Sequence, residues 1–174
     1  MGFRIAATAL ALATAGCALV PEPTSLPELA AVPRAFEMSG RIAVREGQRN
    51  DIARLRWTHA ASGDLWIVAS PLGNEVARIE SDARGAMLTQ AGAPPQQADS
   101  FAQLAQALVG VPIEPATLAA WLHGRESAGS LSGWRVVLDE TQQAGAVRIA
   151  RRLTATRADT VVRLVVDDYR LVPE

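Results

Sequence analysis

Residues that could carry acid–base or metal chemistry are few in this chain. The histidines are His59, expected to end a strand, and His123, expected to end a helix, where the helix dipole favours a cation. Asp167 and Asp168 are adjacent, but neighbours on a strand point to opposite faces, so no joint role is expected. Metalloprotease, phosphate-loop and nucleophile-elbow motifs are absent from the sequence. The sequence therefore indicates a protein that is not an enzyme and needs no cofactor or metal.

The single cysteine, Cys17, is the residue best placed for covalent modification. One cysteine excludes an internal disulfide and a multi-cysteine metal site. It follows Arg4 and an apolar run over 5–15, which has the length of a signal-peptide core and is too short to span a bilayer. This arrangement resembles a bacterial lipoprotein signal, in which the cysteine becomes the acylated N-terminus. The alternative is an ordinary secretory signal cut near "ATA" that leaves Cys17 as a free thiol.

The "SPLG" stretch at 70–73 has the composition of a tight turn, with Pro71 at its second position and Gly73 at its fourth. The third position normally takes a polar residue because turns lie in water, yet here it is Leu72. A single exposed leucine needs no functional explanation. Contact with another apolar phase is the alternative.

The overall composition is that of one globular domain. The chain has 174 residues, is 49% hydrophobic and 20% charged, and carries a formal net charge of −1. A net charge so close to zero gives no indication of a basic surface that binds nucleic acid. Residues 18–34 hold four of the ten prolines and no apolar period, which indicates a semi-rigid tether. We therefore expect a signal peptide at 1–16, a lipidated Cys17 with a proline-rich tether at 17–34, and a single domain at 35–174, monomeric in solution.

Most of the domain has the two-residue period of β-strands. In 51–59, the residues Ala53, Leu55 and Trp57 fall on one face, with arginines and a threonine on the other. The other predicted strands are 36–46, 64–70, 75–81, 85–91, 132–140, 146–157 and 159–172. The spacing of the breaks between them is typical of antiparallel hairpins.

Two short helices are predicted to interrupt the strands. Residues 99–110 have helical apolar spacing, with Asp99 as N-cap and Gly110 as the stop. Residues 111–124 follow, with Pro115 suited to the first helical position. The order predicts a mainly β fold, a curved sheet or open barrel with the helices packed on its concave side.

Four tryptophans are many for a domain of this size. Trp57, Trp121 and Trp134 fall on faces expected to be interior, and Trp66 lies on the strand that leads into the turn. These side chains either form an ordinary core or line an apolar pocket.

The order of these motifs resembles the LolB family of outer-membrane lipoprotein receptors. The resemblance covers most of the chain and rests on the lipoprotein signal, the tether, "SGRIAV", "RLRW", "SPLG", "LVGVPI…LAAWLHG", "GWRV" and "VDDYRLV". It implies an antiparallel, incompletely closed β-barrel, or half-barrel, with a short helical lid inserted mid-chain. It also implies lipid anchoring in the outer membrane, facing the periplasm. Ala18 after the cysteine, in place of the aspartate that signals inner-membrane retention, agrees with that location.

The resemblance implies a function as well: accepting acylated lipoproteins from a LolA-type periplasmic carrier and inserting them into the inner leaflet of the outer membrane. Leu72, flanked by Pro71 and Gly73, matches the family's membrane-insertion loop. Alternation and helical period give candidate walls for an acyl-chain cavity: Leu55, Trp57, Val68, Ile79, Leu104, Leu108, Trp121, Leu122 and Trp134. The alternative is a structural or assembly lipoprotein whose β-domain binds a protein partner without a lipid cavity. A periplasmic hydrolase is disfavoured because no nucleophile–base pair is evident.

Overall fold

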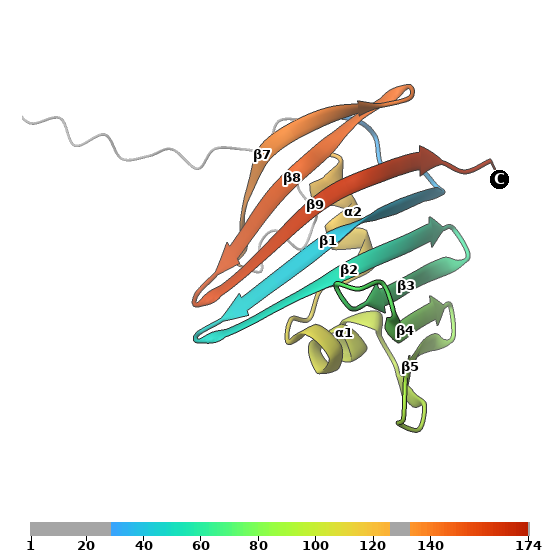
Figure 1. The fold of residues 1–174 in the computed structure, drawn as a ribbon. Coiled ribbons are helices and arrows are strands. Elements are labelled where there is room, and N and C mark those ends of the chain that lie inside the picture. Colours follow the sequence, from blue (N-terminus) through green and yellow to red (C-terminus); the bar gives the residue numbers. More distant parts are fainter. Residues whose placement is uncertain (1–28, 126–132, 174) are drawn as a thin grey trace, which may run out of the picture.

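One antiparallel sheet and two helices make up the described part of the chain, residues 29–125 and 133–173 of a computed structural model (Figure 1). The signal peptide, Cys17 and most of the tether lie outside these residues. The strands are β1 (Phe36–Glu46), β2 (Arg49–Ala60), β3 (Gly63–Ala69), β4 (Glu75–Asp82), β5 (Gly85–Gln90), β6 (Gln96–Ala98), β7 (Arg135–Ala144), β8 (Val147–Arg157) and β9 (Thr160–Leu171).

The strands are ordered β6-β5-β4-β3-β2-β1-β9-β8-β7, and neighbouring strands are antiparallel. Consecutive hairpins give most of this order. The exception is β1, which also pairs with the C-terminal strand β9. Because β6 and β7 are the two ends of the order, the sheet does not close on itself. The predicted mainly β, incompletely closed fold is confirmed.

Alternation along the strands separates an inner face from an outer one. In β1, Met38, Ile42 and Val44 are buried, while Arg41 and Arg45 between and beyond them are exposed. The inner face is thus continuous and apolar, and the outer face is polar.

The helices are α1 (Phe101–Val109) and α2 (Pro115–Leu122). Ser100, not the predicted Asp99, is the N-cap of α1, because its side chain accepts a hydrogen bond from the Gln103 backbone N–H. Gly110 ends α1 with φ of 80°, as predicted. Pro115 takes the first turn of α2, also as predicted.

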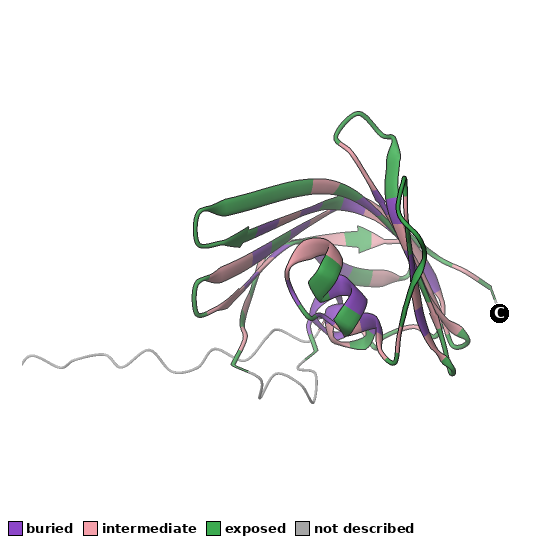
Figure 2. Ribbon diagram, turned by 90° about the horizontal axis from the view of Figure 1, so that it is seen from below, coloured by how far each residue is buried: buried purple, intermediate pink, exposed green. Residues whose placement is uncertain are grey.

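Both helices lie inside the curve of the sheet, and the sides that face it are buried (Figure 2). α1 packs against β4, β5 and β6, and α2 packs against β8. Phe101, Leu104 and Ala105 form the buried stripe of α1, whereas α2 is buried on most of its surface. The predicted helical lid therefore occupies the concave side of the sheet.

A β-bulge lies where β1 meets β9. Ser39 pairs with Asp168 but Gly40 pairs with Val166, so Asp167 is the extra residue. Both aspartates are exposed: Asp167 accepts a hydrogen bond from Arg41 at 3.0 Å, and Asp168 accepts one from Ser39 at 3.4 Å. The prediction that the two carboxylates point to opposite faces is wrong, because the bulge breaks the alternation.

Candidate functional site

The predicted cavity walls come together in one hydrophobic cluster between the sheet and the helices. Seven of them are at most 4% exposed: Leu55, Trp57, Val68, Ile79, Leu104, Trp121 and Leu122. Leu108 and Trp134 are partly buried and pack against the same cluster. These residues thus share an apolar interior, and the helices cover it.

Aromatic rings run through this interior from the sheet to the first helix. Phe36 meets Trp57 edge to face at 4.9 Å between ring centroids, and Trp57 meets Trp66 at 5.9 Å. Trp66 in turn contacts Phe101 of α1 at 4.8 Å. Sequence reasoning did not assign Trp66 to the interior, although it lies two residues before the predicted wall residue Val68 and so shares its face of β3.

Two indole N–H groups inside the cluster lack hydrogen-bond acceptors among the described residues. They belong to Trp66 and Trp121, whose side chains are at most 1% exposed. A buried donor without a partner costs roughly 1–3 kcal/mol. Both groups would gain free energy from any acceptor that enters the interior.

The carboxylate of Asp64 is hydrogen-bonded to a side chain of the cluster. Asp64 accepts hydrogen bonds from Trp57 Nε1 at 2.7 Å and lies 2.7 Å from His59 Nδ1. Within the described residues, no group of three or more histidine, cysteine or acidic side chains is arranged to hold a metal. His59 is therefore engaged in packing and hydrogen bonding.

His123 is fully buried rather than lying exposed at the end of α2. Its Nδ1 is 2.7 Å from the Ala119 carbonyl oxygen, and its Nε2 is 3.0 Å from the Tyr169 hydroxyl. Burial lowers the pKa of His123 below its ordinary value of 6.5, and the neighbouring His59 adds to that shift. His123 does end α2, as predicted, but its burial opposes the cation that the helix dipole would favour.

Neutral burial of His123 predicts that stability falls in mild acid. The unfolded chain takes up a proton near pH 6.5, whereas the folded chain resists protonation. This contribution to the free energy of unfolding is complete above that pH and is lost as the pH falls through the folded pKa. Denaturant unfolding of wild type and His123→Gln between about pH 7.5 and about pH 5 should show a shallower loss in the variant. Equal pH dependence would contradict this account.

Two hollows lie on the surface, away from the predicted cavity walls. One of about 600 Å³ lies beside the β4–β5 hairpin and is lined by residues such as Glu80, Asp82 and Asp99. Another of about 390 Å³ lies on the outer face beside Arg56 and Asp168. None of the predicted wall residues lines either hollow. The predicted wall residues instead pack against one another and the helices in the hydrophobic cluster.

The predicted turn at 70–73 is a rigid projection of the β3–β4 connection. The Gly73 N–H donates to the Ser70 carbonyl at 2.8 Å, and the Ser70 N–H donates to the Asn74 carbonyl at 2.8 Å. Arg54 Nε on β2 donates to the Pro71 carbonyl at 3.1 Å. Leu72 at the tip is 90% exposed. The turn thus holds an apolar side chain in water.

This turn and the lid lie on opposite faces of the sheet. In Figure 1 the β3–β4 connection passes in front of β2, whereas α2 lies behind β1 and β9. Arg54, which holds the turn, is exposed on the outer side of β2. Neither helix in the described residues has the length and hydrophobicity to cross a membrane.

Comparison with known proteins gives a consistent result. The family described as "Outer membrane lipoprotein LolB" matches residues 34–169. A protein named outer-membrane lipoprotein LolB from Thiobacillus denitrificans is 30% identical over 180 residues, covering 94% of this chain and 95% of the relative. Another from Chromobacterium violaceum is 32% identical over 130 residues, covering 72% and 70%. The crystal structure of a DUF1329 family protein from Desulfovibrio piger shares the fold, with a TM-score of 0.53 and 7% identity over 79% of this chain and 85% of that one.

Proposed function

Because the chain belongs to the LolB family of outer-membrane lipoproteins, we propose that it accepts acylated lipoproteins from a LolA-type periplasmic carrier and inserts them into the outer membrane. The family is one of lipoprotein localisation and is not an enzyme family. The chain itself is an outer-membrane lipoprotein.

Cys17 is the proposed anchor, with acyl chains that hold the protein in the inner leaflet. Stable anchoring takes two or more chains, since each buried CH₂ adds about 0.8 kcal/mol. The end of the tether reaches the domain at the lid: the N–H groups of Leu29 and Ala30 both donate to the His123 carbonyl at 3.2 Å. The anchor therefore joins the folded domain next to α2.

The interior under the lid is the proposed site for the cargo's acyl chains. Exposing one long chain to water costs on the order of 10 kcal/mol, so a receptor must cover it. The inner face of the sheet offers a continuous apolar surface, and α1 and α2 now cover it. An acyl chain that displaced the helices would bury this surface in their place, which offsets the cost of opening.

The observation that carries the proposal is the pair of indole N–H groups, on Trp66 and Trp121, that find no acceptor in the described part of the chain. A core that served only stability would be expected to satisfy or avoid such donors. Lipid-modified cargo brings ester and amide carbonyl oxygens together with its hydrocarbon chains. Those oxygens are acceptors of the kind that the two donors lack.

Leu72 is the proposed membrane-insertion residue. Its exposure on a braced turn supports this role, because the fold holds it away from the core at the cost of leaving a leucine in water. Inserted in the leaflet, the turn would bring the domain against the membrane while cargo leaves.

Transfer of radiolabelled lipoprotein tests the proposed function. The lipoprotein is first loaded on a purified LolA-type carrier, and the full chain is then added without nucleotide. The label is expected to move to the chain and afterwards to vesicles. Label that stays with the carrier would contradict the proposal and favour the alternative, an assembly lipoprotein whose packed interior holds no acyl chain.

A further inference from the structure

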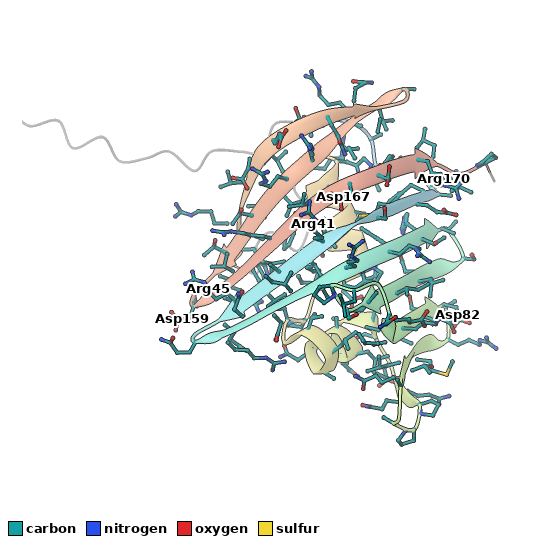
Figure 3. The ribbon with its side chains drawn as sticks, in the orientation of Figure 1. Arg41, Arg45, Asp82, Asp159, Asp167 and Arg170 are labelled. Carbon is teal, nitrogen blue, oxygen red and sulfur yellow. The ribbon has the colours of Figure 1, made fainter. Side chains whose placement is uncertain are left out.

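Six exposed arginines lie on the outer side of the central strands β1, β2 and β9, and one of them, Arg170, is paired with Glu37. The other five form a separate group. They are Arg41 and Arg45 on β1, Arg54 and Arg56 on β2, and Arg163 on β9, and all are exposed. We refer to them as the outer arginine face. Figure 3 shows Arg41 and Arg45 on β1, on the side of the sheet that faces the viewer.

Most of these side chains have no acidic partner. Arg41 forms an ion pair with Asp167 at 3.0 Å. Among the described residues, Arg45, Arg56 and Arg163 form no ion pair, and Arg54 makes its hydrogen bond to the backbone of the Leu72 turn. Asp167 and Asp168 are also exposed on this face, and they offset part of its charge. The five arginines still leave an excess of positive charge there, on a protein whose formal net charge is −1.

The strand register places like charges together. Arg41 and Arg54 are directly opposite each other in the β1–β2 pair. Arg163 lies opposite Ala43, which in turn lies opposite Ile52. Like charges at facing positions destabilise a sheet. A bound anionic surface would relieve that repulsion.

Apolar groups accompany the positive charge. Ile52 is 57% exposed on the same strand and side as Arg54 and Arg56. Leu72, 90% exposed, projects from the turn that Arg54 holds. Unpaired arginines beside protruding aliphatic side chains match the two layers of a membrane surface, anionic headgroups and hydrocarbon.

We infer that the outer arginine face, together with Ile52 and Leu72, docks on anionic phospholipid headgroups. The sheet then lies with its outer face against the inner leaflet. The helices, on the opposite face, are left open to the periplasm, where a carrier would arrive. This inference rests on the proposed membrane role of Leu72 and adds the lipid class and the orientation of the domain.

An acidic protein is the other partner that such charge would fit. Protruding aliphatic side chains without a surrounding polar rim favour the membrane. In a protein interface, the apolar centre is surrounded by satisfied polar contacts. On this face, Ile52 lies on the strand that carries Arg56, which forms no ion pair among the described residues, and Leu72 projects from the turn that Arg54 holds.

The test uses the full chain reconstituted with vesicles, with a fluorescent coumarin amino acid at position 43, between Ile52 and Arg163 in the register. A control carries the same probe at Ala83 in the β4–β5 turn. Vesicles of phosphatidylethanolamine with phosphatidylglycerol are compared with vesicles of phosphatidylethanolamine with phosphatidylcholine. A lipid-borne quencher should quench the probe at position 43 only in the anionic vesicles, and less so as salt is raised.

Charge variants then identify the arginines. Arg56→Gln/Arg163→Gln removes no ion pair of the described residues, and it should lower the ratio of docked to free domain by on the order of tenfold or more. Arg84→Gln/Arg148→Gln removes two arginine charges from exposed positions in the β4–β5 turn and near the start of β8, and it also breaks the Arg84–Asp82 ion pair. It should change that ratio by less than about twofold.

Three results would overturn the inference. The first is quenching that is equal in vesicles with and without anionic lipid. The second is an equal effect of the two charge variants. The third is a defect of Arg56→Gln/Arg163→Gln only in transfer from the carrier, which would indicate an acidic protein partner. The proposed function is judged separately by label transfer. Docking without cargo uptake would refute the proposed function but support the proposed lipid-binding surface. Cargo uptake without docking would support the function and refute the lipid-binding surface.

Discussion

Leu72→Glu is expected to block delivery of lipoproteins to vesicles and leave their uptake from the carrier intact. Leu72 is 90% exposed and its turn is closed by backbone hydrogen bonds, so the folded domain should not depend on its side chain. Replacing leucine by glutamate removes the free energy gained by transferring the leucine side chain into the leaflet, about 2 kcal/mol or more. The charge of glutamate adds a further cost of insertion. Delivery should slow by roughly thirtyfold or more, measured as label appearing in vesicles.

Two controls separate insertion from folding. Leu72→Ile keeps an apolar tip and should deliver at close to the normal rate. Asn74→Glu places the same charge at the base of the turn and should have a smaller effect. If Leu72→Glu delivers normally, the turn has no part in insertion.

Gly40→Ala should produce a large loss of stability. A Cβ at Gly40 would lie 2.1 Å from the Val165 carbonyl oxygen on the neighbouring strand, and backbone cannot move aside as a flexible side chain can. The site is also the bulge that joins β1 to β9, the pairing that ties the C-terminal strand to the middle of the sheet. We expect a loss of more than about 3 kcal/mol, measured by denaturant unfolding.

Gly47→Ala, in the turn of the β1–β2 hairpin, is the matched control. A Cβ there meets nothing within 4 Å, although φ of 56° costs about 1 kcal/mol for a residue with a side chain. Equal losses in the two variants would mean that the contact at Gly40 is relieved without disturbing the sheet.

Much of the sheet could be predicted because one face meets a core and the other meets water. In β2 the alternation of Leu55 and Trp57 with arginines set both the strand and its inward side correctly. β3 is apolar on both faces, so alternation was a weaker guide there: Val68 was assigned to the interior, but Trp66 on the same face was not. β6 is only Gln96–Ala98, too short and polar for any period to reveal it.

Two of the corrections share a cause: they depend on tertiary contacts. The bulge that puts Asp167 and Asp168 on one side depends on Gly40 of a distant strand. His123 is buried because Tyr169 of β9 comes to lie against it. The choice of Ser100 over Asp99 as N-cap was a matter of one residue, within the usual uncertainty of a helix end.

The sequence could predict which residues face the interior, but not whether that interior is open or closed. The periods of two and of 3.6 place Leu55 and Leu104 toward a shared interior, yet they cannot say whether that interior is open. In the structure the lid fills it. Binding an acyl chain there requires α1 and α2 to move away from the sheet. The apolar inner face and the indole N–H groups without acceptors among the described residues support such a movement.

The most direct test of acyl-chain binding under the lid uses cargo whose acyl chain carries a photoreactive group. After transfer from the carrier, irradiation and peptide mapping locate the contacts. The account predicts attachment to inward-facing side chains of α1, α2 and the central strands, with Leu104 and Trp121 among them. Attachment confined to outer residues such as Val161 and Arg163, with cargo bound, would contradict it.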